Sequence, residues 1–172
     1  MWNDNRGVAL FYRCSPMTDV KVLTVQTPTF GEIEVSEEKI FFFSEGIPGF
    51  PQVRRFAILE SAEHAPFRYL QSLGSPPIAL LIINPFLLHP GYECHVADRD
   101  MQDLQTDRPE DISVYAVATI PEDPTEATIN LMAPILINEK NRCGKQVILL
   151  DSQYSVRHPL LTPAGPDGAG AA

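Results

Sequence analysis

Cys94 and two nearby histidines, His89 and His95, are the residues of this chain best suited to binding a metal ion. Imidazole nitrogens and thiolates are preferred ligands of zinc in proteins. Consecutive residues of an extended segment point to opposite sides, however, so Cys94 and His95 do not easily converge on one ion. Because the other two histidines, His64 and His158, are isolated in the sequence, we predict that the chain has no metal site.

Two serines and a glycine-rich loop suggest other chemistry, but the motifs that normally accompany them are missing. Ser44 and Ser72 lie in turn-like stretches, and neither stands in the G-x-S-x-G motif of a hydrolase nucleophile. The stretch GIPGF (46–50) lacks both phosphate-loop patterns, GxGxxG and GxxxxGK, and no helix pattern follows it. A tight turn that places Phe50 in the core is the better interpretation. We predict no catalytic residue and no cofactor.

Acidic residues are concentrated between Glu93 and Glu126. This segment holds ten acidic residues and two arginines, a net charge of −8 out of −9 for the whole chain. Polar residues and prolines surround these carboxylates, whereas an acid–base pair needs two different environments that separate the pKa values. A nucleic-acid binder needs the opposite charge. The segment is therefore either a solvated face or a surface that attracts a basic partner.

The segments that carry these residues have mostly the patterns of short strands. Apolar and polar residues alternate in several of them, and the sixteen prolines disfavour long helices. The best helix candidate is 98–105, with Asp98 as its cap and with Met101, Leu104 and Gln105 on one side. We predict an all-β barrel, roll or sandwich, built from nine strand-like runs: 21–27, 31–43, 54–61, 67–74, 76–86, 92–98, 112–120, 128–138 and 145–150.

The run TINLMAPILIN (128–138) contains three residues that are poor strand formers, Asn130, Pro134 and Asn138. Every second residue from Ile129 to Ile137 is apolar, which predicts one buried face. No catalytic partner accompanies either asparagine. A proline in the middle of a strand is best tolerated at an edge or a bulge, and we predict that Pro134 interrupts a strand edge. Asn138 leads into the turn EKNRCGK (139–145), where Gly144 is expected to adopt positive φ before a second strand completes a hairpin.

Three consecutive phenylalanines follow the acidic turn SEEK (36–39). In a strand, Phe41 and Phe43 point to one side and Phe42 to the other. Burial in the core is the ordinary outcome for all three. The alternative for Phe42 is an exposed position as an anchor for a protein partner, because aromatic residues are enriched at interfaces.

The composition and the two ends of the chain predict one domain. At 172 residues the chain is long enough to bury a core. Residues 1–16 read as an amino-terminal extension, disordered or preceding a native start at Met17. Residues 17–160 form the domain, and the proline-, glycine- and alanine-rich residues 161–172 form a disordered tail. Three cysteines without a CxxC pair favour a reducing cytoplasm, and no apolar run is long enough to span a membrane.

Three stretches of the sequence together resemble the FliW family of flagellar assembly factors. They are FGEIEVSEEKIFFFSEGIPGF (30–50), PFRYLQSL (66–73) with the later IINPF, and TINLMAPILIN followed by GKQVIL. The last combination is the most specific, and the resemblance extends from about Val20 to Leu160. It implies a β-barrel-like roll, or pseudobarrel, closed by one or two short capping helices. It also implies a cytoplasmic protein without enzymatic activity or cofactor.

The resemblance further implies two protein partners, flagellin and the translational regulator CsrA. Such a protein relieves the repression of flagellin mRNA by CsrA without binding nucleic acid or membrane itself. Since CsrA-type proteins are small and basic, acidic residues are expected to contribute to docking. The partner-binding candidates are Glu37, Glu38, Phe42, Asp103, Asp107, Glu110 and Asp111. Flagellin, which exposes apolar terminal segments before assembly, is expected to use an apolar groove or an edge strand.

Two other functions are compatible with a small β-rich chain. One is a flavin-binding split-barrel oxidoreductase, although Arg54 and Arg55 are the only adjacent basic pair available to a phosphate. Flavin absorbance in the purified protein would favour it. The other is a purely structural component of the flagellum, which secretion into the assembled organelle would support.

Overall fold

The computed structural model describes residues 8–10, 21–150 and 153–161 of the chain. Short strands dominate this part of the protein, and a single α-helix, α1 (Asp98–Asp103), accompanies them together with five short 3₁₀ helices. The strands are β1 (Val8–Leu10), β2 (Val22–Thr27), β3 (Gly31–Ser36), β4 (Ile40–Phe42), β5 (Arg55–Glu60), β6 (Arg68–Ser72), β7 (Ala79–Ile83), β8 (Ile112–Thr119), β9 (Thr128–Asn138), β10 (Cys143–Gln146) and β11 (His158–Pro159).

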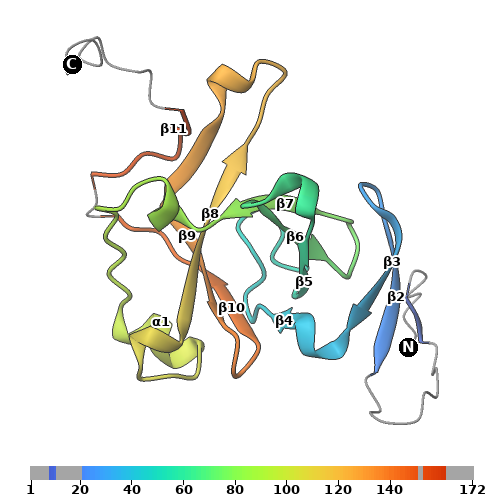
Figure 1. Cartoon of the computed structure of the whole chain (residues 1–172). Coiled ribbons are helices and arrows are strands. Elements are labelled where there is room, and N and C mark those ends of the chain that lie inside the picture. The colour runs from blue at the N-terminus through green and yellow to red at the C-terminus, as the bar shows by residue number, and fades with distance from the viewer. Residues whose placement is uncertain (1–7, 11–20, 151–152, 162–172) are drawn as a thin grey trace.

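Seven of these strands, β4 to β10, close into a barrel (Figure 1). Neighbours from β4 to β9 pair antiparallel in chain order. Strand β10 then closes the ring, because it pairs antiparallel with β9 and parallel with β4, where Cys143 lies opposite Phe42. Strand β11 adds one short pairing outside the ring, on β9. The predicted all-β, barrel-like roll is confirmed.

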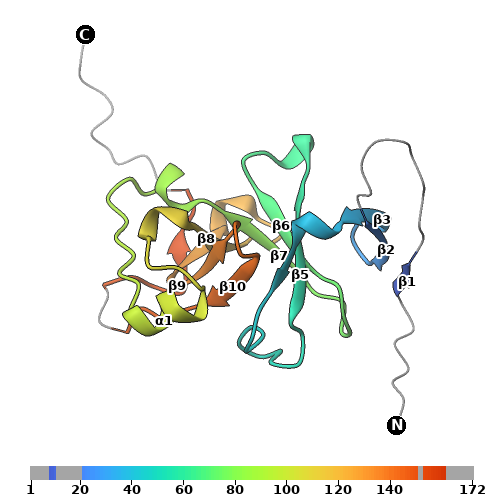
Figure 2. The ribbon, with the colours of Figure 1, turned by 90° about the horizontal axis from the view of Figure 1, so that it is seen from below.

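A second sheet, in the order β1–β2–β3, packs against one side of the barrel (Figure 2). The alternation predicted for β3 is present: Glu32 and Glu34 are exposed, while Val35 is buried. Val35 and Leu23 pack against Ala57 of the barrel strand β5. Strand β1 lies within the range predicted as an extension. The rest of that range, Met17 and residues 162–172 lie outside the described residues, so the predicted domain boundaries stay predictions.

The core follows the period-two pattern of the strands, most clearly in β9. Ile129 and Leu131 belong to one buried cluster, and Ile135 and Ile137 belong to the cluster inside the barrel. Leu136 points to the other face and is fully buried as well. It packs against the loop that follows α1 and against β10, so both faces of this end of β9 are covered.

Pro134 lies in a bulge and not at a strand edge, since β9 pairs with β8, β10 and β11. The register between β8 and β9 shifts at Ala116. Residues 131–134 of β9 stand opposite this single residue of β8. The Asn130 side chain holds the bulge by accepting a hydrogen bond from the Ala133 backbone N–H at 2.9 Å. A proline fits here because a bulged residue donates no ladder hydrogen bond. The predicted strand edge is therefore wrong, and Pro134 occupies a bulge, the other setting in which a strand tolerates proline.

The expectation of positive φ at Gly144 is also wrong, because the residue of the turn with positive φ is Arg142, at 54°. The reason for a glycine at position 144 is steric instead. A Cβ atom at this position would overlap the ring of Phe43, which is fully buried.

Helix α1 begins where the sequence predicts, but Asp98 is its first residue and not its cap. The cap is Ala97, whose side chain makes no capping hydrogen bond. Met101 and Leu104 share the buried side, as predicted, but Gln105 is exposed, so that part of the prediction is wrong. Gln105 ends the helical conformation with a φ of 56°.

Candidate protein-binding surface

The turn between β9 and β10 (residues 139–142) connects two acidic parts of the chain that are far apart in sequence. Lys140 Nζ lies 2.5 Å from Asp111 Oδ1, in the 3₁₀ helix Pro109–Asp111. On the other side of the turn, Arg142 Nη1 donates to the Glu37 carbonyl at 2.9 Å. The turn thus lies between the SEEK segment and the segment after α1 (Figure 1).

Two asparagines fix the same turn to the chain beyond α1. Asn138 is fully buried, and its Nδ2 donates to the Leu104 carbonyl at 2.7 Å. Its Oδ1 accepts from the backbone N–H of Lys140 at 3.1 Å, which stabilises the turn. Asn141 Nδ2 donates to the Gln105 carbonyl at 2.7 Å. Asn138 is therefore a structural residue that joins the hairpin to the acidic loop.

Lys145 of β10 holds α1 against the barrel. Its Nζ lies 2.8 Å from Asp100 Oδ1 and 2.6 Å from Asp103 Oδ2, and its side chain is largely buried. The hydrogen bond from Lys145 lowers the pKa of Asp103. Burial alone would lower the pKa of Lys145, but the hydrogen bonds to the two carboxylates outweigh it and the pKa is raised. Asp103 and Lys145 are therefore both charged at neutral pH.

The acidic residues predicted for partner binding divide into two groups. Three of them have a basic partner within the chain: Asp103 with Lys145, Asp111 with Lys140, and Glu110 with Arg108 at 2.9 Å. The other three, Glu37, Glu38 and Asp107, take part in no ion pair among the described residues. Charge that an intramolecular partner already neutralises attracts an external cation less strongly. Glu37, Glu38 and Asp107 are the stronger candidates.

Phe42 stands next to the same turn. Its side chain is 49% exposed, whereas Phe41 and Phe43 are buried, as predicted for alternate strand residues. The Phe42 backbone N–H donates to the Arg142 carbonyl at 2.8 Å, and Phe42 lies opposite Cys143 in the sheet. An exposed aromatic side chain with polar and charged neighbours matches the usual anatomy of a protein interface.

The structure therefore brings the seven predicted residues around one hairpin. Glu37, Phe42, Asp103 and Asp111 contact the hairpin directly. Glu38 and Glu110 are adjacent to two of them in sequence, and Asp107 lies on the loop between Asp103 and Asp111. We call this set, with the turn 139–142, the hairpin surface. Sequence reasoning missed the three basic residues that organise it, Lys140, Arg142 and Lys145. Their positions inside a hairpin carried no signal of long-range pairing.

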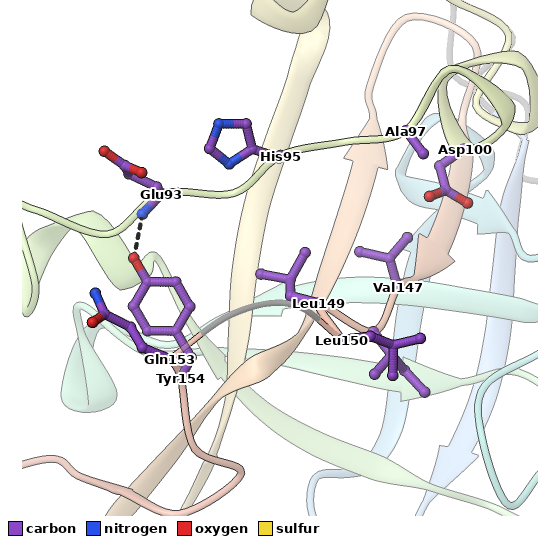
Figure 3. A pocket seen from close by; sticks show the side chains of 10 residues that line it. Glu93, His95, Ala97, Asp100, Val147, Leu149, Leu150, Gln153 and Tyr154 are labelled. Atoms are coloured by element: carbon purple, nitrogen blue, oxygen red, sulfur yellow. Dashed lines mark hydrogen bonds between the residues drawn. The ribbon is translucent and has the colours of Figure 1, made fainter.

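A cleft of about 670 Å³ lies beside α1, whose Asp100 forms part of its wall (Figure 3). The extended run Glu93–Ala97 and the residues after β10, 147–150, line it, and Asp100 and Tyr154 complete it. The Tyr154 hydroxyl accepts a hydrogen bond from the Glu93 backbone N–H at 2.7 Å. The walls therefore combine carboxylates with aliphatic side chains.

Cys94 and His95 diverge at this cleft, as the sequence predicts. His95 is exposed in the cleft, while Cys94 is half-buried against the core. Burial raises the pKa of the Cys94 thiol to about 11, so the thiol stays protonated at neutral pH. Elsewhere His89 stacks on His158 at 5.5 Å between ring centroids, which the sequence did not indicate.

Within the described ranges, no group of three or more His, Cys, Asp or Glu residues is placed to hold a metal ion. The described part of the chain also contains no helix long and apolar enough to cross a membrane.

Comparisons with known proteins agree on one family. The family model described as FliW protein matches residues 24–160, which include the whole barrel and the hairpin surface. The flagellar assembly factor FliW of Caldicellulosiruptor saccharolyticus is 41% identical over 141 residues, covering 82% of this chain and 92% of that protein. The corresponding Bacillus subtilis protein is 36% identical over 138 residues, covering 80% of this chain and 96% of that protein.

The same likeness extends to three dimensions. A crystal structure of the flagellar assembly factor FliW superposes with a TM-score of 0.77 at 36% sequence identity. The match covers 83% of this chain and 99% of the other.

Proposed function

The chain belongs to the FliW family of flagellar assembly factors, and from that premise we propose that it is a non-enzymatic cytoplasmic adaptor with two alternative partners. One partner is flagellin. The other is CsrA, whose repression of flagellin mRNA translation is relieved when the adaptor binds it. When secretion removes free flagellin, the adaptor is released to bind CsrA, and synthesis of flagellin resumes.

The observation that carries the CsrA part of the proposal is the hairpin surface. Exposed Phe42 stands beside the turn 139–142, and the hairpin surface also carries Glu37, Glu38 and Asp107, three carboxylates that form no ion pair with any other described residue. CsrA-type proteins are small and basic, so opposite charges draw the two proteins together and raise the association rate. The same carboxylates repel the RNA phosphates that compete for CsrA. Burial of the Phe42 ring then slows dissociation.

Control of flagellin synthesis requires that the two partners exclude each other. Exclusion follows if the two sites overlap, or if each partner lowers the affinity for the other by the same factor. In both cases the concentration of free flagellin determines how much adaptor is available to CsrA, because flagellin competes for the adaptor. The proposal therefore predicts two complexes and no stable complex of all three proteins.

The test uses the purified full-length chain with CsrA and flagellin. We expect the chain to capture each protein alone, and we expect added flagellin to release CsrA in proportion to its concentration. A labelled flagellin mRNA leader bound to CsrA should be released by the chain and rebound after flagellin is added. Capture of neither protein would refute the proposal, and formation of a stable ternary complex would refute the alternation of partners.

A further inference from the structure

The segment that follows β10 has one paired edge and one unpaired edge. The Val147 N–H donates to the Pro134 carbonyl at 3.0 Å, and the Leu149 N–H donates to the Met132 carbonyl at 2.8 Å. Both bonds point toward β9. Successive backbone groups of an extended chain point to opposite sides, so the N–H and C=O of Ile148 point away from β9. No hydrogen bond of the Ile148 backbone is formed within the described part of the chain.

This unpaired edge faces the cleft of about 670 Å³. Ile148 and Leu150 are 56% and 77% exposed, although they are large apolar residues. Val147 and Leu149 project toward the run Glu93–Ala97 on the opposite wall (Figure 3). An open strand edge beside exposed aliphatic side chains is the arrangement that accepts an added strand from another chain.

The charged groups of the cleft indicate which side chains the added strand carries. Glu93 is exposed on one wall, and Asp100 lies on another. Asp100 already pairs with Lys145 at 2.8 Å, while Glu93 takes part in no ion pair among the described residues. A lysine or arginine on the incoming segment would therefore find its partner at Glu93.

We propose that this cleft binds an extended protein segment that pairs with the backbone of Ile148. The segment presents apolar side chains to Ile148 and Leu150 and a Lys or Arg to Glu93. The residues of this site lie outside the hairpin surface. The proposal goes beyond the proposed function because it adds a second, separate binding site.

The experiment uses fluorescein-labelled hexapeptides in which Thr alternates with Val, Leu, Ile or Phe and one position is Lys. Binding to the full-length chain is measured by fluorescence polarisation. We expect saturable binding that the substitution Ile148→Ser weakens about tenfold. Val156→Ser is the matched control, since Val156 is also β-branched and 54% exposed but does not line the cleft. Glu93→Lys should abolish the preference for peptides that contain Lys.

Backbone pairing has its own signature. Two versions of the best peptide, N-methylated at odd or at even positions, each lose the hydrogen bonds of one edge. Only one version should lose binding. Equal binding of both versions, equal effects of Ile148→Ser and Val156→Ser, or no binding by any peptide of the set would overturn the proposal. A concentration-dependent dimer in sedimentation velocity that Ile148→Ser dissociates would also overturn it, because the occupant would be a second copy of the chain.

Discussion

Gly144 shows how a single residue couples the hairpin surface to the barrel core. It is buried on β10 opposite Ile137, and the Phe43 ring occupies the space where a side chain would begin. Phe43 is the residue after Phe42, the exposed candidate anchor. The absence of a side chain at Gly144 therefore lets β10 approach β4 closely enough to close the barrel beside Phe42.

The substitution Gly144→Ala should lower the free energy of unfolding by about 1–3 kcal/mol, the usual cost of overpacking a core. Urea denaturation followed by fluorescence measures this directly. Gly74→Ala is the control, because a Cβ atom at Gly74 meets nothing within 4 Å. Equal stability of the two variants would contradict the close packing of Gly144 on Phe43.

Among the elements, the β9–β10 hairpin has two roles. It completes the barrel through the pairing of β10 with β4, and its turn holds the acidic segments on both sides. Lys145 extends the second role, because it fastens α1 to β10 through Asp100 and Asp103. The position of the acidic loop thus depends on the hairpin.

The ion pairs of Lys145 predict a pH dependence of stability. Because the pKa of Asp103 is lowered in the folded state, the pair stabilises the fold above the ordinary aspartate pKa of about 3.9. This contribution is lost as the pH falls through the lowered pKa. Lys145→Met should therefore cost roughly 1 kcal/mol at about pH 7 and clearly less at about pH 3. Denaturant titrations of both proteins at both pH values measure the difference, and an equal cost at the two pH values would contradict this account.

Much of the element list could be predicted from the sequence, because β9, β8 and β3 show period two and the composition disfavours long helices. The start of the helix at Asp98 and the orientation of Phe42 opposite to Phe41 and Phe43 follow from the same periodicities, whereas the ordinary expectation of a buried Phe42 is wrong. Closure of the barrel could not be predicted, since the parallel pairing of Cys143 with Phe42 leaves no local pattern. The exposure of Ile148 was also hidden, because four consecutive apolar residues normally indicate a buried strand.

For the candidate surface, the sequence supplied the acidic residues but not their different electrostatic states. Asp103 and Asp107 are equivalent in the sequence, yet among the described residues only Asp103 has a basic partner, which is Lys145 from 42 residues away. That pairing is a consequence of the tertiary fold. Reversing the charge of Asp103 or Asp111 would also break ion pairs that hold the fold. Glu38 and Asp107 form no such ion pair within the described part of the chain and are therefore the better residues to change.

At the scale of the whole molecule, two groups of acidic residues lie at opposite ends of the barrel (Figure 1). The hairpin surface is at the α1 end of the barrel, and the loop between β8 and β9, which carries Glu122 and Glu126, projects from the opposite end (Figure 1). Both glutamates are exposed. The two ends therefore allow the effect of local charge to be separated from the effect of net charge.

The most direct test of the central claim compares two double variants with identical net charge, Glu38→Lys/Asp107→Lys and Glu122→Lys/Glu126→Lys. Association with CsrA is measured by stopped-flow fluorescence over a range of salt concentrations. We expect the first variant to associate about tenfold more slowly at low salt and to lose most of the salt dependence. The second variant should remain close to the unmodified chain. Equal slowing of both variants, or an association rate that salt does not change in any of the three proteins, would contradict docking of CsrA at the hairpin surface.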